Sequence, residues 1–192
     1  MKTEMEKWET EEGVNYLRKI GIRTGDVVLD FGARIGHYSI PAAIIVGNNG
    51  LVYAIDKEQA SLNKLEKKAK ALGLRNIKII KNSGGVNLNL QNESIDTVLL
   101  YDMLHSLNQG ERKIFYSEVY RVLKPYGLLS VYPKHVIEDF PLGEFQNLHF
   151  DDVKQEIEDS SFLFNEKLCG KLSHDDELNS GCVLNFKKYL KT

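Results

Sequence analysis

Short apolar runs alternate with helical patterns along most of the chain, and this alternation constrains the fold more than any other feature. Five runs have the length of buried strands, and they are Val27–Asp30, Leu51–Asp56, Ile77–Lys81, Ile95–Tyr101 and Leu128–Tyr132. Their apolar residues are nearly continuous, which is typical of strands covered on both faces of a parallel sheet. Helical patterns lie beside them at Glu11–Ile20, Glu58–Leu72 and Gln109–Leu123. Strands joined by helices at this spacing need right-handed crossovers, so the sequence predicts an α/β fold with a doubly wound sheet.

The last third of the chain gives a looser pattern. We expect residues 134–148 to form a connection and Asp151–Ser160 to form a short helix. The final apolar runs, Ser161–Gly170 and Gly181–Leu190, are predicted to pair as an antiparallel hairpin whose loop is the polar stretch Lys171–Ser180.

The 192 residues are enough for one full core, and they contain no repeat and no convincing linker. We therefore expect a single domain, 1–192. Within it, residues 1–20 would be an N-terminal helical cap, and residues 134–148 are the candidate connection on the substrate side.

Composition excludes several classes of partner. Lys and Arg total 25 against 27 acidic residues, so the net charge of −2 indicates neither a nucleic-acid partner nor an anionic membrane. No segment reaches the ~20 apolar residues of a membrane span. The polar, acidic start of the sequence does not resemble a secretory signal, so a cytoplasmic location is expected.

The two cysteines, Cys169 and Cys182, lie in apolar stretches near the C-terminus. The interpretation that suits a reducing cytoplasm is a pair of buried free thiols. No ligand spacing accompanies them, so no metal site is expected.

The turn after the first predicted strand carries the chemistry. In an open parallel sheet, ligands bind beyond the carboxyl ends of the strands, where Asp30, Gly32 and Gly36 fall. Gly32 allows a tight turn, and Gly36 allows the next helix to begin close to the sheet. That helix, expected to begin near His37, has unpaired N–H groups at its start that suit a carboxylate or a phosphate.

A second acid, Asp56, ends the second predicted strand. It is able to accept hydrogen bonds from two ribose hydroxyls, or to cap the helix that follows, and the sequence leaves both roles open. The stretch "GARIGH" lacks the Gly-x-Gly-x-x-Gly loop of dinucleotide enzymes, and no P-loop motif is present.

Four segments, in order, resemble class I S-adenosylmethionine-dependent methyltransferases of the small-molecule type. They are "GDVVLDFGARIGHYSIPAA", "GLVYAIDKEQASL", "SIDTVLLYDMLHSL" and "EVYRVLKPYGLLSVY". The resemblance implies a Rossmann-like methyltransferase fold, in which a mostly parallel seven-stranded sheet ends in an antiparallel last strand. It also implies S-adenosylmethionine as the cofactor.

The resemblance further assigns roles around that cofactor. Asp30 would lie under the methionine amino group, Asp56 would bind the ribose, and Lys57 would flank the adenine. The backbone of Gly32, Ala33, Arg34 and Gly36 would line the methionine part. Tyr101 and Asp102 would form the wall near the reactive methyl.

Two departures from the family pattern stand out. Arg34 occupies a position where the family usually has glycine, and its guanidinium would either point to solvent or grip the cofactor's carboxylate. The stretch after the third strand, "KNSGGVNLNLQ", contains no acid to bind the adenine amino group, so Ser83 or a backbone carbonyl is the expected substitute.

Methyl transfer depends mainly on alignment, and a base is needed only where the acceptor must lose a proton. His105, just beyond the fourth predicted strand, is the candidate catalytic base, although capping or packing of the next helix would also explain it. His135 is a weaker candidate that would face the acceptor, and His37 a candidate wall of the cofactor pocket.

Little room exists in the chain for substrate-selecting insertions, so the predicted acceptor is a small organic molecule. A homodimer stays open. Two alternatives also stay open: a non-catalytic binding or regulatory subunit with a methyltransferase fold, and a nicotinamide-dependent oxidoreductase on a similar sheet.

Overall fold

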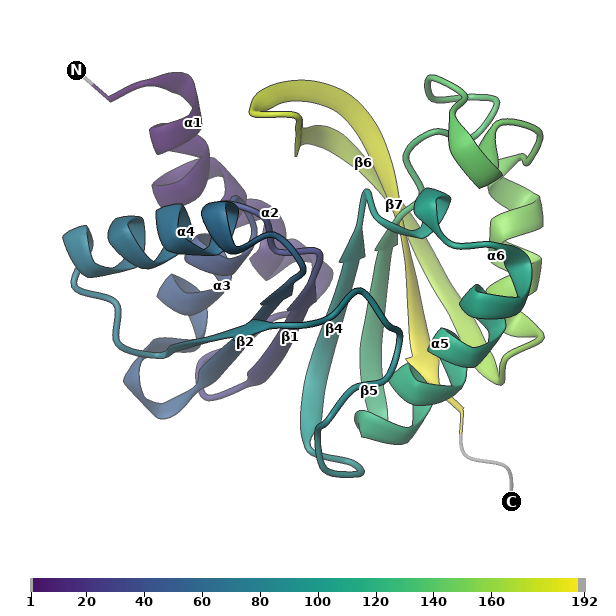
Figure 1. Ribbon diagram of the computed structural model, residues 1–192, viewed down its shortest axis with the longest axis horizontal. Coiled ribbons are helices and arrows are strands. Elements are labelled where there is room, and N and C mark those ends of the chain that lie inside the picture. The colour runs from purple at the N-terminus through teal and green to yellow at the C-terminus, as the bar shows by residue number, and fades with distance from the viewer. Residues whose placement is uncertain (1, 190–192) are drawn as a thin grey trace. The chain divides into compact units, whose positions relative to one another are not determined.

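The computed structural model describes residues 2–189, so Met1 and residues 190–192 of the predicted domain lie outside the described residues. Seven strands form one sheet in the order β3-β2-β1-β4-β5-β7-β6 (Figure 1). The strands are β1 Val27–Phe31, β2 Leu51–Asp56, β3 Ile77–Lys81, β4 Ile95–Tyr101, β5 Leu123–Tyr132, β6 Phe162–His174 and β7 Glu177–Lys188. β2 pairs in parallel with β1 and β3, β4 pairs in parallel with β5, and β7 pairs antiparallel with β5. The predicted fold class is confirmed.

Helices connect these strands where the sequence indicates them. The α-helices are α1 Glu4–Lys7, α2 Gly13–Ile20, α3 Ser39–Val46, α4 Gln59–Ala71, α5 Gln109–Val122 and α6 Phe150–Glu158. A π-helical segment, η1 Trp8–Glu12, joins α1 to α2, and single 3₁₀ turns occur at η2 Gly47–Asn49, η3 Leu104–Ser106 and η4 Gly143–Phe145. Among residues 2–189, no helix combines the length and the apolar character needed to cross a membrane.

The chain forms two compact units. The first unit comprises the chain as far as Gly85 together with Lys171–Ser180, and the second comprises Val86–Gly170 together with the chain from Gly181 onward. The β6–β7 hairpin therefore contributes its tip to the first unit and its base to the second.

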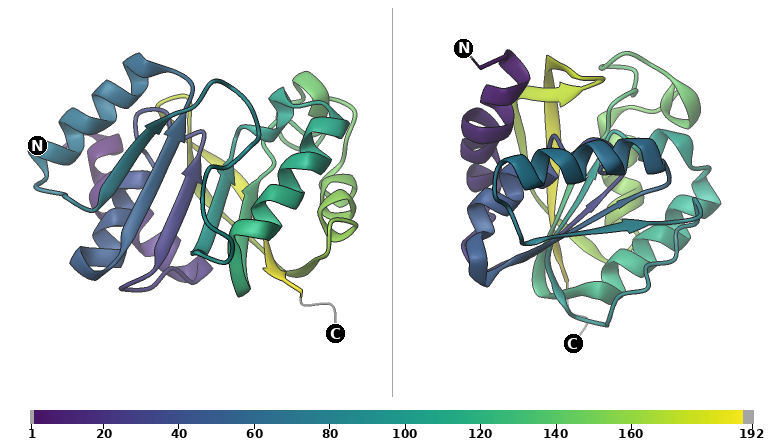
Figure 2. Two further views of the ribbon diagram at one scale, coloured as in Figure 1. Left: turned by 60° about the horizontal axis from the view of Figure 1, so that its bottom comes forward. Right: turned by 60° about the vertical axis from the view of Figure 1, so that its left-hand side comes forward.

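In the first unit, helices α3 and α4 pack against β1, β2 and β3 (Figure 2). The apolar side chains of Leu62 and Leu65 on α4 are buried in a core shared with the start of α3 and with β2. The buried members of this core are Ala33, Ile40, Ala54, Leu62 and Leu65. Burial of these side chains is what fixes α4 beside the end of β2, where the predicted site lies.

In the second unit, β5 begins at Leu123, although the sequence predicts a helix to that residue and a strand only from Leu128. Leu123 already pairs with Ile95 of β4, and the register shifts before Thr97 pairs with Leu128. The stretch "KPYG" therefore lies within β5 at a bulge or irregularity of the ladder. Tyr126 in this stretch has φ of 61°.

The hairpin differs from the prediction in its loop. The sequence predicts a ten-residue loop at Lys171–Ser180, but β6 and β7 continue through this stretch to a two-residue turn, Asp175–Asp176. Both turn residues have positive φ, 49° and 64°, as in a type I′ turn. In this stretch buried, half-buried and exposed residues do not alternate regularly, and the buried ones include the polar Ser173, so the hydrophobic alternation that marks a strand is weak.

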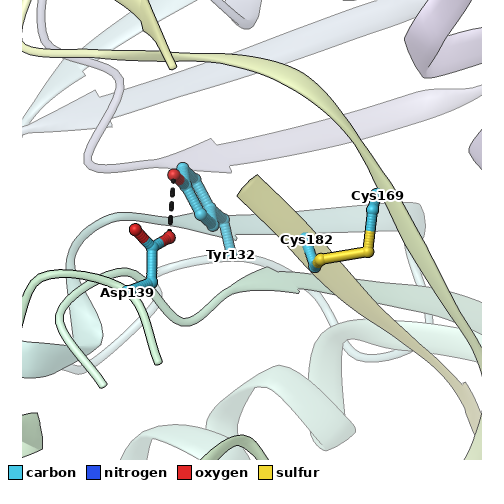
Figure 3. The surroundings of a disulfide bond; sticks show 4 residues. All are labelled: Tyr132, Asp139, Cys169 and Cys182. Carbon is cyan, nitrogen blue, oxygen red and sulfur yellow. Dashed lines mark hydrogen bonds between the residues drawn. A yellow bond between two sulfur atoms is a disulfide. The ribbon is translucent and has the colours of Figure 1, made fainter. Parts of the chain in front are cut away.

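The prediction of two free thiols is wrong, because Cys169 and Cys182 form a disulfide (Figure 3). Each cysteine lies six residues from the turn, so the hairpin register places them opposite each other, with Cα atoms 4.0 Å apart. Disulfides persist mainly in oxidising compartments and in hyperthermophiles. The expected cytoplasmic location therefore loses the support that free thiols gave it.

Reduction of this disulfide should destabilise the protein, because the cross-link restricts the unfolded chain. We expect the melting temperature to fall by roughly 5–10 °C, the equivalent of about 2–3 kcal/mol in a chain of this size. Thermal unfolding with and without a reductant measures the effect. The double variant Cys169→Ser/Cys182→Ser should melt at the lower temperature and ignore the reductant, and equal melting temperatures throughout would contradict the prediction.

Candidate functional site

The carboxyl ends of β1 and β2 bring two buried acids into the first unit. Asp30 is only 2% exposed, and its Oδ2 accepts a hydrogen bond of 2.5 Å from Ser39 Oγ. Burial raises the pKa of Asp30 to about 6, although the hydrogen bond from Ser39 works in the opposite direction. Asp56 contributes further to this increase through charge repulsion. The end of β1 therefore holds a carboxyl group that favours a cationic neighbour.

Asp56 ties the loop after β1 to the start of α4. Its Oδ2 accepts the backbone N–H of Arg34 and its Oδ1 accepts that of Glu58, each at 2.8 Å. The N-cap of α4 is Glu58, so Asp56 does not cap the helix itself. Asp56 instead accepts the backbone N–H of the capping residue. The loop is also bonded to the backbone of β2, since the N–H groups of Gly32 and Ala33 donate to the Ile55 carbonyl at 2.9 and 3.0 Å.

Both glycines of the loop have the backbone that the sequence predicts. Gly32 and Gly36 have φ of 87° and 92°, a region that other residues rarely adopt. A Cβ at Gly36 would lie 2.3 Å from Leu65 Cδ1, so the absence of a side chain allows close packing against α4. The helix itself begins at Ser39, two residues later than expected.

Arg34 also has positive φ, 46°, in a position where the family usually has glycine. A residue with a side chain in this region costs on the order of 1–2 kcal/mol. Its guanidinium binds a carboxylate of the same chain, because Nη1 lies 2.8 Å from Asp175 Oδ1 on the hairpin tip. The structure thus gives Arg34 a partner that the sequence analysis did not consider.

His37 lies between two acids. Its Nδ1 is 2.7 Å from Glu9 Oε1 and its Nε2 is 2.9 Å from Asp176 Oδ1. Burial opposes ionisation of Glu9, but hydrogen bonds from His37 and from Lys68 outweigh it and lower the pKa of this carboxyl. The hydrogen bond from His37 likewise lowers the pKa of Asp176. Glu9, Asp175 and Asp176 were missed by the sequence analysis, since 28 to 141 residues separate them from their partners.

Lys57 and Ser83, the predicted adenine contacts, are exposed in the first unit. Ser83 follows β3 in a turn where Gly84 N–H donates to Asn82 Oδ1 at 2.9 Å. Their roles stay predictions.

The second unit brings the other predicted residues together at the end of β4. Tyr101 is buried, with its hydroxyl 2.7 Å from Ser130 Oγ. Asp102 follows with φ of 54°, and its Oδ1 lies 3.6 Å from His105 Nδ1. The predicted base and an acid are therefore neighbours.

A second histidine faces the same carboxylate. His135 Nε2 is 3.3 Å from Asp102 Oδ1, and the His105 and His135 rings meet at 4.4 Å in a tilted edge contact. His135 Nδ1 lies 2.8 Å from the carbonyl of Phe140, and because a carbonyl only accepts, this nitrogen carries a proton. Asp139 in the same connection accepts from the Tyr132 hydroxyl at 3.3 Å (Figure 3).

Among solved structures, the fold matches that of S-adenosylmethionine-dependent methyltransferases. One from Aquifex aeolicus aligns with a TM-score of 0.75 at 23% identity, covering 95% of this chain and 92% of that one. The cyclase SpnF aligns with a TM-score of 0.73 at 14% identity, covering 94% and 82%. The class of fold is thus defined, although SpnF shows by its name that one fold serves more than one reaction.

Sequence comparison then gives the family. Residues 28–127, more than half of the chain, match the methyltransferase domain family, and the chain belongs to it. The probable cobalt-precorrin-6B C(15)-methyltransferase (decarboxylating) of Saccharolobus solfataricus is 39% identical over 85 residues, 44% of this chain and 43% of that protein. The ubiquinone/menaquinone biosynthesis C-methyltransferase UbiE of Blochmanniella pennsylvanica is 30% identical over 128 residues, 67% and 47%. The chain thus spans less than half the length of these two relatives.

The buried carboxyl of Asp30 should make stability depend on pH. The pKa of this group is about 6 in the folded chain against an ordinary 3.8, so the folded state keeps a proton that the unfolded state releases. The contribution is full below pH 3.8 and is lost as pH rises to about 6, by on the order of 3 kcal/mol. Urea unfolding of wild type and Asp30→Asn at pH 4.5 and 7 measures it.

Asp30→Asn should lose less stability than wild type between these two pH values. Glu177→Gln, which changes an exposed acid on the hairpin, should behave as wild type. An identical pH dependence in wild type and Asp30→Asn would contradict the assignment of this proton to Asp30.

Proposed function

We propose that this chain is an S-adenosylmethionine-dependent methyltransferase that transfers a methyl group to a small organic acceptor. The observation that carries the proposal is the geometry of Asp30 and Asp56. They end adjacent parallel strands and are linked by a loop with two left-handed glycines, within the residues that match the methyltransferase family. Ligands of open α/β sheets bind at such strand ends.

The residues fit the cofactor's functional groups. A buried carboxyl such as Asp30 favours a cationic partner, which the amino group of the methionine part supplies. Each oxygen of Asp56 accepts one backbone N–H and has capacity for one more bond, so it is able to hold the ribose hydroxyls. Lys57 and Ser83 would flank the adenine, and the backbone from Gly32 to Gly36 would line the methionine part.

Asp102, His105 and His135 in the second unit would act on the acceptor. When bound, the cofactor supplies a methyl group already activated by its sulfonium, so the protein mainly aligns the acceptor. Where the acceptor must lose a proton, His105 is the proposed base and Asp102 orients its ring. His135, held by the Phe140 carbonyl, gives Asp102 a second partner, and Tyr101 would form part of the wall near the reacting methyl.

We propose that the two units act as one catalytic domain, since the family match at residues 28–127 runs through both of them. The connection at residues 134–148 would contact the acceptor, because it supplies His135 and presents three exposed apolar side chains, those of Ile137, Phe140 and Leu142. The names of the relatives, which refer to precorrin and to quinones, support an organic acceptor.

Binding of S-adenosylhomocysteine tests the cofactor site. We expect wild type to bind in the micromolar range, and Asp56→Asn to bind at least about tenfold more weakly because it loses a charged acceptor. Affinity should rise between pH 5 and 7, since the ionised form of Asp30 holds the ligand's ammonium, and Asp30→Asn should bind weakly at both pH values. Isothermal calorimetry measures each, with Glu177→Gln as the matched control.

No binding by wild type, or equal affinity in Asp56→Asn, would defeat the cofactor assignment. Binding without turnover of any small acceptor, together with a stable protein partner, would instead favour the non-catalytic subunit.

A further inference from the structure

We infer that the tip of the β6–β7 hairpin is a positioning element for the cofactor loop, with Asp175 and Asp176 as its positioning residues. The inference deepens the proposed function and rests on it, because the loop that they hold is the proposed lining of the methionine part. Neither acid would touch the reacting atoms. Each acts through a side chain of the loop, Asp175 through Arg34 and Asp176 through His37.

Three contacts join the tip to the loop inside the first unit. Arg34 Nη1 lies 2.8 Å from Asp175 Oδ1, and His37 Nε2 lies 2.9 Å from Asp176 Oδ1. Tyr38 donates its hydroxyl hydrogen to the Ser173 carbonyl at 3.0 Å, and this bond is buried. These three pairs, called the tip contacts below, fix three of five consecutive loop residues to one four-residue stretch of the hairpin.

Acidic and basic side chains alternate around His37. Its two ring nitrogens face the carboxylates of Glu9 and Asp176, which only accept hydrogen bonds. Lys68 also bonds Glu9, at 2.5 Å. Three basic side chains, those of Arg34, His37 and Lys68, thus face three carboxylates, those of Glu9, Asp175 and Asp176. Replacing Asp175 removes the carboxylate that bonds Arg34, and replacing Asp176 leaves His37 and Lys68 to share the single carboxylate of Glu9.

The turn is chemically costly, and this points to a role for its side chains. A type I′ turn prefers Asn-Gly or Asp-Gly, yet its second position here is a further aspartate, Asp176, and the two charges are adjacent. Arg34 likewise has positive φ where glycine would be relaxed. Two unfavourable residues, Arg34 and Asp176, therefore take part in the tip contacts. Interactions that offset such local cost are typical of functional sites.

The expected consequence is slower escape of the ligand. A loop held by its side chains keeps the backbone that lines the ligand in place, so breaking the tip contacts should mainly raise the dissociation rate. A competing possibility is that Asp175 withholds Arg34 from the ligand's own carboxylate. That arrangement predicts the opposite result, tighter binding once Asp175 is neutralised.

The test measures association and dissociation of S-adenosylhomocysteine by stopped flow for Asp175→Asn, Asp176→Asn and the double variant. We expect dissociation to be about threefold faster in the first, whose ion pair is exposed, and about tenfold faster in the second, whose partner is buried, with little change in association. The control is Glu177→Gln, which neutralises the next acid along the hairpin and should match wild type.

Two further measurements separate charge from general structure. Raising the salt concentration should speed dissociation in wild type and far less in the double variant, since exposed ion pairs are screened. The swapped pair Arg34→Asp/Asp175→Arg should regain part of what each single change loses. Equal salt dependence in wild type and the double variant, or no recovery in the swapped pair, would overturn the inference, as would tighter binding in Asp175→Asn.

Hydrogen exchange of the unliganded protein keeps this test apart from that of the proposed function. In the double variant, the backbone amides of residues 33–38 should exchange faster than in wild type, whether or not any ligand binds. Faster exchange without S-adenosylhomocysteine binding in wild type would remove the proposed function and keep the tip contacts. Unchanged exchange would remove the positioning role.

Discussion

The cofactor loop depends on the two hydrogen bonds that the carboxylate of Asp56 accepts from backbone N–H groups. One side chain at the end of β2 accepts the N–H of Arg34 from the loop after β1 and the N–H of Glu58 at the start of α4. Each bond satisfies a backbone donor in a partly buried place, where an unsatisfied donor would cost about 1–3 kcal/mol. The loop, the second strand and the fourth helix therefore hold their positions together, and Gly36 completes the arrangement by packing on Leu65.

Arg34 has an unfavourable backbone conformation, and a residue distant in the sequence binds its side chain. Its backbone has a conformation that glycine adopts freely, with φ of 46°. The hairpin tip supplies the counter-charge from 141 residues away, and a second acid of the same turn engages His37. In the sequence, Arg34 is a departure from the glycine of the family pattern. In the folded chain it belongs to a cluster of three basic and three acidic side chains that also includes Asp176, the unfavourable residue of the turn.

In the second unit, the residues that form the fold differ from those proposed to carry the chemistry. The residues matched by the methyltransferase family include β4 and the first part of β5, and the side chains that we propose to act on the acceptor lie at the end of β4 and in the connection after β5. Asp102 meets two histidines there, one of which, His135, is locked by a backbone carbonyl. Under the proposed function, this arrangement would determine the preference for the acceptor.

The sequence by itself determined the parallel strands, the crossover helices and the two acids, because strand burial, helical periodicity and strand-end position are all written in neighbouring residues. It predicted β2, β3 and β4 with the bounds observed. Only the tertiary structure decided the length of the hairpin, the Cys169–Cys182 disulfide and the partner of Arg34. Each of these depends on pairing across space. A polar strand without regular hydrophobic alternation gives no strand pattern, and an ion pair between distant residues leaves no periodic signal in the sequence.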